Sequence, residues 1–262
     1  MIRFPAMRLS HAGTSDVGRK RTHNEDAYLL LPEENLFCVA DGMGGHASGE
    51  VAARIAVEEM AEFFRMTGRD EEATWPYKMD PARGYDENRL LTGVKLSNLR
   101  IFERAASDQR LRGMGTTIVA VSFPRAEDAA LVAHVGDSRV YLFRDGALRQ
   151  LTEDHSLLND YKKSRALTPE EIEAFPHKNV IVRALGMKDA VEVDLVRREL
   201  HDGDVFLLCS DGLSGMVPDD RIAELLRGHP RDLKGAGLAL VDAANEAGGQ
   251  DNVTCVLVQA HT

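Results

Sequence analysis

The sequence lacks any apolar run close to the roughly 18 residues that a membrane-spanning helix requires. The first residues, 1–7, also lack the long apolar stretch of a secretion signal. We therefore expect a cytoplasmic protein without a membrane segment. A chain of 262 residues can bury a substantial core, and no change in composition demands a second unit, so we expect one domain over residues 1–262.

Positive charge is also scarce. The chain has 32 lysines and arginines against 42 aspartates and glutamates, which gives a formal net charge of −10. Proteins that bind nucleic acid normally carry a clustered basic face, so this balance argues against a nucleic-acid partner. Clustered acidic side chains are instead suited to recruiting divalent cations.

Cysteine is rare, and the histidines are not spaced as zinc ligands. The three cysteines, Cys38, Cys209 and Cys255, each lie inside an apolar run, which favours small buried core residues over a disulfide framework. The nine histidines show no paired spacing such as His-x-x-x-His. A zinc site is therefore disfavoured.

Apolar periodicity predicts paired helices between groups of short strands. Helical spacing occurs over residues 50–64, 88–106, 219–227 and 233–247, and strand patterns over 9–14, 27–31, 36–40, 116–123, 129–135, 139–143, 147–151, 191–199, 205–209 and 253–259. Two consecutive helices between strands exclude a simple alternation of one strand with one helix. Residues 153–178 are polar, with one short helix signalled by a capping box from Thr168 to Glu171, and we interpret this segment as a flap.

Four apolar runs meet an aspartate at or near one end, and each has a glycine close by. The aspartates are Asp41, Asp137, Asp211 and Asp251, and the glycines are Gly42, Gly136, Gly212 and Gly249. Alone, Asp41-Gly42 is better explained as an ordinary strand-to-helix turn. Four such aspartates on strands that share a core indicate convergence at one rim, where uncompensated carboxylates would repel one another.

Divalent cations would relieve that repulsion. Oxygen ligands without cysteine or histidine are the preference of hard ions, so Mg²⁺ or Mn²⁺ is favoured. Two such ions about 4 Å apart can share a bridging water and make it a nucleophile, an arrangement that suits phosphoester hydrolysis. The basic loop of Arg19, Lys20 and Arg21 would then lie where a guanidinium can grip a phosphate.

Eight short motifs occur in the order found in one enzyme family. They are residues 21–26, 39–46, 113–117, 135–139, 152–156, 183–186, 209–213 and 249–252. In these motifs the chain resembles the metal-dependent type-2C (PPM) serine/threonine protein phosphatases, in particular their compact bacterial members. The resemblance implies an α+β fold, a four-layer α-β-β-α sandwich with two central antiparallel β-sheets flanked by helix pairs.

The resemblance also implies a metal ligand set. Asp41 would bridge two Mn²⁺ or Mg²⁺ ions, with the Gly42 carbonyl on one of them. Asp211 and Asp251 would be ligands of the other ion, and Asp137 would join Asp211 at a third, weaker site.

Further roles follow from the same resemblance. Glu25 and Asp26 would hold metal-bound waters, and Arg21 would bind the substrate phosphate. The segment from about 155 to 180 would be the family's flap beside the active site.

One departure from many relatives concerns the leaving group. Many eukaryotic relatives have a histidine after the Asp-Gly pair, proposed as the general acid, whereas this chain has Met43, which cannot donate a proton. A nearby histidine, His46, and a metal-bound water remain as alternatives. A second departure is Gly215, where some relatives have a further aspartate, which leaves metal coordination there open.

Several other motif residues have simpler structural explanations. Thr116 and Thr117 are expected to be buried strand-start residues, because a metal-activated water makes a protein nucleophile unnecessary. Arg139 is expected to form a structural ion pair, and His155 to order the start of the flap.

The sequence therefore predicts a monomeric protein phosphatase that removes phosphate from phosphoserine and phosphothreonine in protein substrates. The metal-bridging water would attack in one step, and a serine/threonine kinase would oppose the reaction. Two alternatives from other classes are a silent relative that only binds a phosphorylated partner and a Mg²⁺-dependent nuclease. Retention of all four aspartates argues against the first, and the acidic balance argues against the second.

Overall fold

Two antiparallel β-sheets form the centre of the protein. The computed structural model describes residues 8–44, 48–69, 74–164, 168, 171–172, 175 and 180–261. One sheet has the order β1-β11-β10-β7-β8, formed by β1 (Arg8–Asp16), β7 (Arg139–Arg144), β8 (Ala147–Gln150), β10 (Val205–Cys209) and β11 (Val253–His261). The other has the order β2-β3-β5-β6-β9, formed by β2 (Asp26–Leu31), β3 (Leu36–Met43), β5 (Ile118–Ser122), β6 (Ala129–Val135) and β9 (Asp194–Glu199), and β4 (Gly115–Thr116) pairs with the end of β3.

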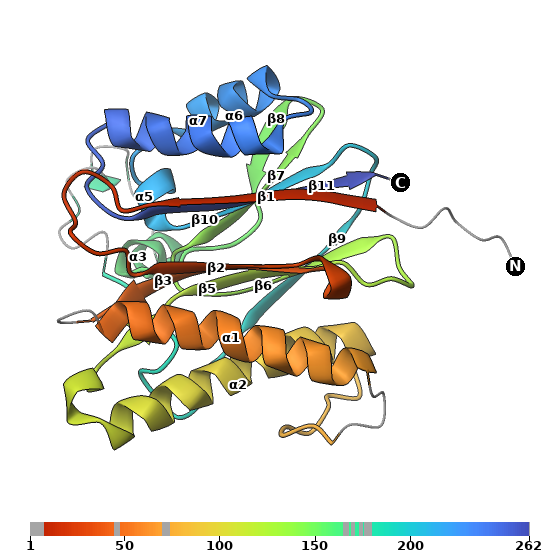
Figure 1. Ribbon diagram of the computed structural model, residues 1–262, viewed down its shortest axis with the longest axis vertical. Coiled ribbons are helices and arrows are strands. Elements are labelled where there is room, and N and C mark those ends of the chain that lie inside the picture. The colour runs from red at the N-terminus through yellow and green to blue at the C-terminus, as the bar shows by residue number, and fades with distance from the viewer. Residues whose placement is uncertain are drawn as a thin grey trace, which may run out of the picture.

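Helix pairs cover the outer faces of both sheets (Figure 1). The β2-β3 sheet carries α1 (Ser48–Arg69) and α2 (Tyr85–Ser107), and the other sheet carries α6 (Asp219–Gly228) and α7 (Leu233–Glu246). Two short 3-10 helices, η1 (Pro32–Glu34) and η2 (Gln109–Leu111), lie in the connections. No helix of the described ranges is long and apolar enough to span a membrane.

Alternation along the strands divides the interior into three apolar layers. In β3, Phe37 and Val39 belong to the layer between the two sheets, whereas Cys38 and Ala40 belong to the layer under α1 and α2. A third layer lies between the β10-β11 face and α6 and α7. Because successive side chains of a strand point to opposite faces, one apolar run supplies two cores.

Several predicted boundaries were wrong. The first helix begins at Ser48 and extends to Arg69, and the strand predicted over 116–123 is interrupted at Thr117, between β4 and β5. The flap contains a helix that was not predicted, α3 (Leu157–Ser164), and a one-turn helix, α5 (Asp211–Ser214), follows β10. The predicted Thr168–Glu171 capping box is present as reciprocal bonds, although much of that segment and His46 lie outside the described residues.

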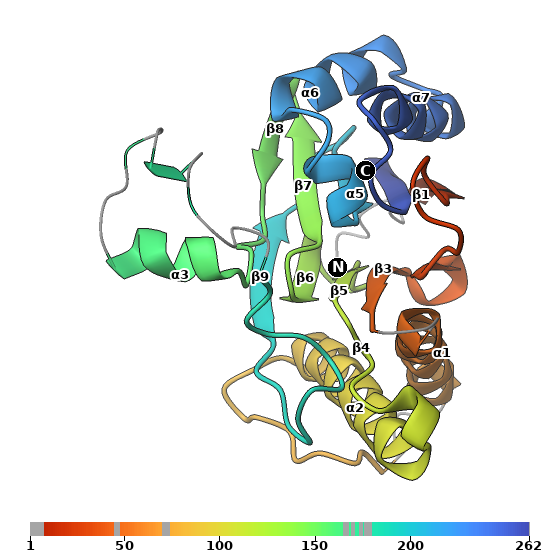
Figure 2. The same ribbon diagram turned by 90° about the vertical axis from the view of Figure 1, so that its left-hand side faces the viewer.

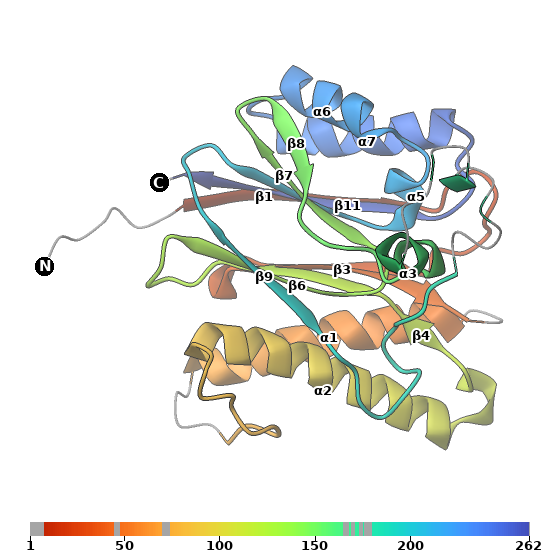
Figure 3. The same ribbon diagram turned by 180° about the vertical axis from the view of Figure 1, so that it is seen from behind.

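The start of β2, the end of β3, the end of β10 and the start of β11 lie at one end of the sandwich. Asp26 at the start of β2 is paired with Asp41 near the end of β3, and Cys209 at the end of β10 is paired with Cys255 near the start of β11. The helix α3 lies at the same end as α5 when seen from the front and from behind (Figures 1 and 3). Figure 2 shows that α3 projects away from the layers of sheets and helices.

Candidate metal centre

The backbone of Asp41 is held on both sides by two threonines. Asp41 N–H donates to Thr117 Oγ1 at 3.1 Å, and its carbonyl accepts from Thr117 N–H at 2.9 Å and Thr116 Oγ1 at 2.8 Å. Both threonines are fully buried. They therefore have the structural role that was predicted, and they fix the strand end from which the Asp41 side chain extends.

Gly42 occupies a position where no side chain fits. A Cβ atom there would lie 2.2 Å from the carbonyl oxygen of Gly49 and 2.5 Å from that of Glu25. The Gly42 N–H donates to the same Glu25 carbonyl at 3.1 Å. Glycine is required because the first turn of α1 and the chain before β2 both approach this peptide closely.

Arg21 and Asp251 form an ion pair at the rim. Arg21 Nη2 lies 2.8 Å from Asp251 Oδ2, and the other oxygen of Asp251 accepts from the Asn252 N–H at 2.8 Å. This pairing raises the pKa of Arg21, with smaller contributions from Glu25 and Asp41. Arg21 therefore lies within the field of the predicted metal ligands while half of its side chain stays exposed.

Asn252 organises the loop that carries Arg21 and Glu25, although the sequence suggested no role for it. Its Oδ1 accepts from the Glu25 N–H at 2.8 Å, and its Nδ2 donates to the carbonyls of Val17 and His23, both at 2.9 Å. One buried amide thus satisfies three backbone groups of a loop more than 220 residues away in the sequence.

Asp211 begins α5 immediately after the buried residue Ser210. Ser210 donates to Asp26 Oδ2 at 2.8 Å and accepts from the Thr254 N–H at 3.0 Å. The ends of β10 and β11 are therefore tied to the start of β2 in the opposite sheet. This link brings Asp26 and Asp211 to the same side of the rim.

Asp137 follows β6 in a tight turn. Gly136 has a φ of +109°, and a Cβ there would lie 2.6 Å from Thr117 Cγ2, so glycine is needed on both counts. Asp137 is 8% exposed, and its Oδ1 has no hydrogen-bond partner among the described residues. Burial, followed by the charge of Asp211, raises the pKa of Asp137 to about 7.

The carboxylates of the site destabilise one another. Burial raises the pKa of Asp41 well above its usual range, and four neighbouring carboxylates raise it further, those of Asp26, Asp211, Asp137 and Asp251. Burial raises the pKa of Asp26 to about 7, and that of Asp211 is also raised, first by burial and then by Asp251. The predicted convergence of strand-end aspartates is confirmed by these mutual interactions.

The donor set fits hard divalent cations. It consists of carboxylates and the peptide of Gly42, which neighbouring backbone approaches closely. Asp26 and Asp137 each have one buried carboxylate oxygen without a hydrogen-bond partner in the described part of the chain. Away from this site, the described residues contain one group of three side chains whose potential ligand atoms lie within 4.8 Å of one another. This group consists of His134, His155 and Asp194.

Comparisons with known proteins agree with this arrangement. Residues 12–246 match the family model described as protein phosphatase 2C. The chain belongs to the protein phosphatase 2C family. It is 37% identical over 252 residues to the serine/threonine phosphatase stp of Listeria monocytogenes, covering 94% of this chain and 93% of that protein.

Solved structures of phosphatases also resemble the chain over almost its whole length. The serine/threonine phosphatase PstP/Ppp of Mycobacterium tuberculosis has a TM-score of 0.83 and 35% identity, covering 97% of this chain and 99% of that one. The catalytic domain of PstP in complex with two manganese ions has a TM-score of 0.81 and 34% identity, covering 98% and 100%. The predicted family, the α+β sandwich and the enzyme class of protein serine/threonine phosphatase are thereby confirmed, and the predicted cofactor agrees with the manganese named for this relative.

The flap of this phosphatase 2C chain adjoins the carboxylates. A polar pocket of about 370 Å³ lies between α3 and the site, with Asp137 and Asp211 on one side and Leu158 and Lys162 on the other. Arg139, which also lines it, forms a two-pronged ion pair with Asp154 at 2.9 and 2.7 Å, so the predicted structural role of Arg139 is confirmed.

Met43, two residues after Asp41, lines a groove of about 510 Å³. Residues two apart in a strand lie on the same face, about 7 Å apart, so Met43 follows Asp41 along the face that bears the site. The groove is lined by Met43, Ile181, Val182, Arg183, Ala184, Met187, Lys188, Ala190, Val191 and Glu192. Its apolar residues include Val182 and Met187, which are 47% and 55% exposed.

Proposed function

We propose that this protein hydrolyses phosphoserine and phosphothreonine in proteins by direct attack of water, at the carboxylate rim. The observation that carries the proposal is the convergence of Asp26, Asp137, Asp211 and Asp251 on Asp41. Arg21 pairs with Asp251, but the charges of these five carboxylates together would still require cations to balance them. A silent relative that only bound phosphoproteins would have no use for this destabilising arrangement. A nuclease is disfavoured by the net charge of −10.

The proposed ligands are divided among the strand ends. Asp41 and the Gly42 carbonyl would hold one cation, and Asp41, Asp211 and Asp251 would hold the second, with Asp137 and Asp211 at a third, weaker site. Mn²⁺ or Mg²⁺ bound there would supply an activated water and neutralise phosphate charge. The proposal for Gly42 is supported by the close approach of backbone that leaves no room for a side chain.

Glu25 and Asp26 would orient water around the cations. Asp26 is suited to this because Ser210 fixes one of its oxygens and the other has no partner among the described residues. Met43 supplies no proton, so the leaving alkoxide would take its proton from water in the site.

Arg21 would grip the substrate phosphate in two places, since its planar guanidinium matches two phosphate oxygens. We expect Arg21→Ala to lower kcat/KM for a phosphoserine peptide by about 10- to 100-fold, the loss of a hydrogen bond to a charged group. The assay is phosphate release in Mn²⁺, with KM and kcat determined separately.

Lys20→Ala is the matched control for Arg21, because Lys20 is an exposed cation of the same loop. It should leave kcat/KM within about twofold of the parent protein. Equal losses in the two variants would mean that Arg21 contributes only general positive charge, and no loss in either would remove Arg21 from the mechanism.

The groove lined by Met43 would receive residues that flank the phosphorylated side chain. Val182→Ser and Met187→Ser should lower kcat/KM about fivefold for a phosphopeptide with apolar flanking residues, because burying such side chains contributes about 1 kcal/mol when half of the surface is covered. An aryl phosphate, which has no flanking residues, should be hydrolysed at the parental rate. Leu238→Ser, at a similarly exposed leucine of α7, is the control, and equal losses with both substrates would contradict the assignment.

Residues 1–262 would act as one catalytic domain, with the flap at about 155–180 forming a wall of the site. A serine/threonine kinase would supply the phosphorylated proteins that this enzyme consumes. We also propose that the enzyme works as a monomer in the cytoplasm.

A further inference from the structure

Four segments of the chain meet at His155, at the base of the flap. The N–H of His155 donates to the Gly136 carbonyl at 2.9 Å, and the His155 carbonyl accepts from the Val182 N–H at 2.9 Å. Its Nε2 lies 3.3 Å from Asp194 Oδ2 and 3.2 Å from Arg183 Nη1. His155 thus connects the end of β6, the entry and exit of the flap, and the start of β9.

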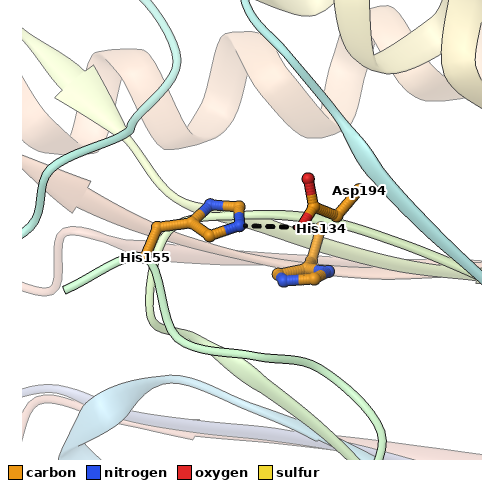
Figure 4. Close-up of side chains that lie close together, drawn as sticks. All are labelled: His134, His155 and Asp194. Carbon is orange, nitrogen blue, oxygen red and sulfur yellow. Dashed lines mark hydrogen bonds and ion pairs between the residues drawn. The ribbon is translucent and has the colours of Figure 1, made fainter. Parts of the chain in front are cut away.

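The hydrogen bonds fix the tautomer of His155. The Gly136 N–H donates to His155 Nδ1 at 3.1 Å, so Nδ1 must be unprotonated and the ring proton must lie on Nε2, which donates to Asp194 (Figure 4). Burial lowers the pKa of His155, and the positive charge of Arg183 lowers it further, which agrees with a neutral ring.

This tautomer argues against a metal ion among His134, His155 and Asp194, although their potential ligand atoms lie within 4.8 Å of one another. His155 Nε2 carries the proton and faces the Arg183 cation, so it has no lone pair for a metal. The rings of His134 and His155 are also stacked, with centroids 4.7 Å apart and planes inclined by 24°. Stacked rings do not direct their in-plane lone pairs at one point.

The same bonds control the backbone in front of Asp137. His155 binds both the N–H and the carbonyl of Gly136, and Thr117 lies so close to Gly136 that a Cβ atom there would clash with it. Asp137 Oδ1 has no hydrogen-bond partner of its own in the described ranges. The direction of this carboxylate is therefore set by the turn that His155 holds.

We propose that His155 is a positioning residue that orients the Asp137 carboxylate toward the metal centre. It also couples this orientation to the position of the flap base. This rests on the proposed ligand role of Asp137. The flap helix α3 begins at Leu157, two residues after His155, so displacement of the flap base moves the residue that holds the Gly136 peptide.

Two substitutions separate the nitrogens of the ring. His155→Asn keeps an acceptor near the Nδ1 position, and His155→Gln keeps a donor near the Nε2 position but has no acceptor for the Gly136 N–H. We expect His155→Gln to lower kcat for a phosphopeptide, or to raise the Mn²⁺ concentration for half-maximal rate, by about tenfold, as for other residues that orient metal ligands. His155→Asn should stay within about threefold of the parent protein.

His134→Gln is the matched control, because His134 stacks on the same ring but donates to the Glu153 carbonyl instead of contacting Gly136. It should leave the Mn²⁺ dependence unchanged. Thermal unfolding of each variant in chelator detects loss of folding, and a fall in rate counts for the proposal only in variants that remain folded at the assay temperature.

The decisive measurement repeats His155→Gln in an Asp137→Asn background. If His155 acts through Asp137, the second substitution should change kcat less than twofold there, since the two effects are not additive. A full tenfold loss in that background, or equal losses for His155→Gln and His155→Asn, would overturn the positioning role alone. If Asp137→Asn itself changes neither kcat nor Mn²⁺ dependence, the ligand role of Asp137 fails, and the positioning role fails with it.

Discussion

Asp211→Asn is expected to lower kcat for a phosphoserine peptide by about 10³-fold, the equivalent of about 4 kcal/mol of transition-state stabilisation. An amide is nearly isosteric with the carboxylate but has no negative charge, so the proposed cation that Asp211 shares with Asp41 and Asp251 would be bound weakly. The measurement is phosphate release at saturating Mn²⁺. Addition of excess chelator to the parent protein should abolish turnover to the same extent.

The same substitution should not destabilise the metal-free protein. Burial and the charge of Asp251 raise the pKa of Asp211, so its ionised form is disfavoured in the folded state, and a neutral amide relieves that cost. In chelator, the melting temperature of the variant should equal or exceed that of the parent protein. Asp220→Asn, at an exposed aspartate in the first turn of α6, is the control and should keep full activity. Undiminished turnover in chelator would exclude the proposed metal-dependent hydrolysis.

The clustering of Asp41 with the other strand-end aspartates could be predicted because it depends on features that are local in the sequence. An apolar run that ends at an aspartate and a glycine identifies a strand end, and repetition of the pattern indicates a shared rim. The role of Asn252 could not be predicted in this way. Its three partners belong to a distant loop, and no periodicity or spacing in the sequence connects the two segments.

The flap helix α3 was missed because its residues, Leu157–Ser164, are mostly polar and it has no buried residue. Its apolar residues, Leu157, Leu158 and Tyr161, share one face, but a helix of eight residues is too short for periodicity to identify it. A start signal was nevertheless present, since Ser156 Oγ accepts from the Asn159 N–H at 3.3 Å in the manner of a helix N-cap. Because only a short helix of eight residues follows it, such a cap is difficult to distinguish in sequence from an ordinary turn.

Stabilisation of the protein by Mn²⁺ is expected to be larger at pH 8 than at pH 5. Asp137 has a pKa of about 7 in the folded state against 3.8 for an ordinary aspartate carboxyl, and the pKa of Asp26 is raised to a similar value. Between about pH 4 and 7 the folded, metal-free protein therefore holds protons that the unfolded chain has already released. Its free energy of unfolding must fall as the pH rises through this range, by on the order of 4 kcal/mol for Asp137 alone.

Cations reverse this trend, because they replace the protons among the carboxylates and bind better as the carboxylates ionise. The measurement is the difference in melting temperature with Mn²⁺ and with chelator, taken at pH 5, 6, 7 and 8, which removes pH effects common to both conditions. Asp137→Asn should make the difference less dependent on pH, whereas Asp128→Asn, at an exposed aspartate, should not. A difference that stays constant from pH 5 to 8 in the parent protein would mean that these carboxylates are not the groups that the metal compensates.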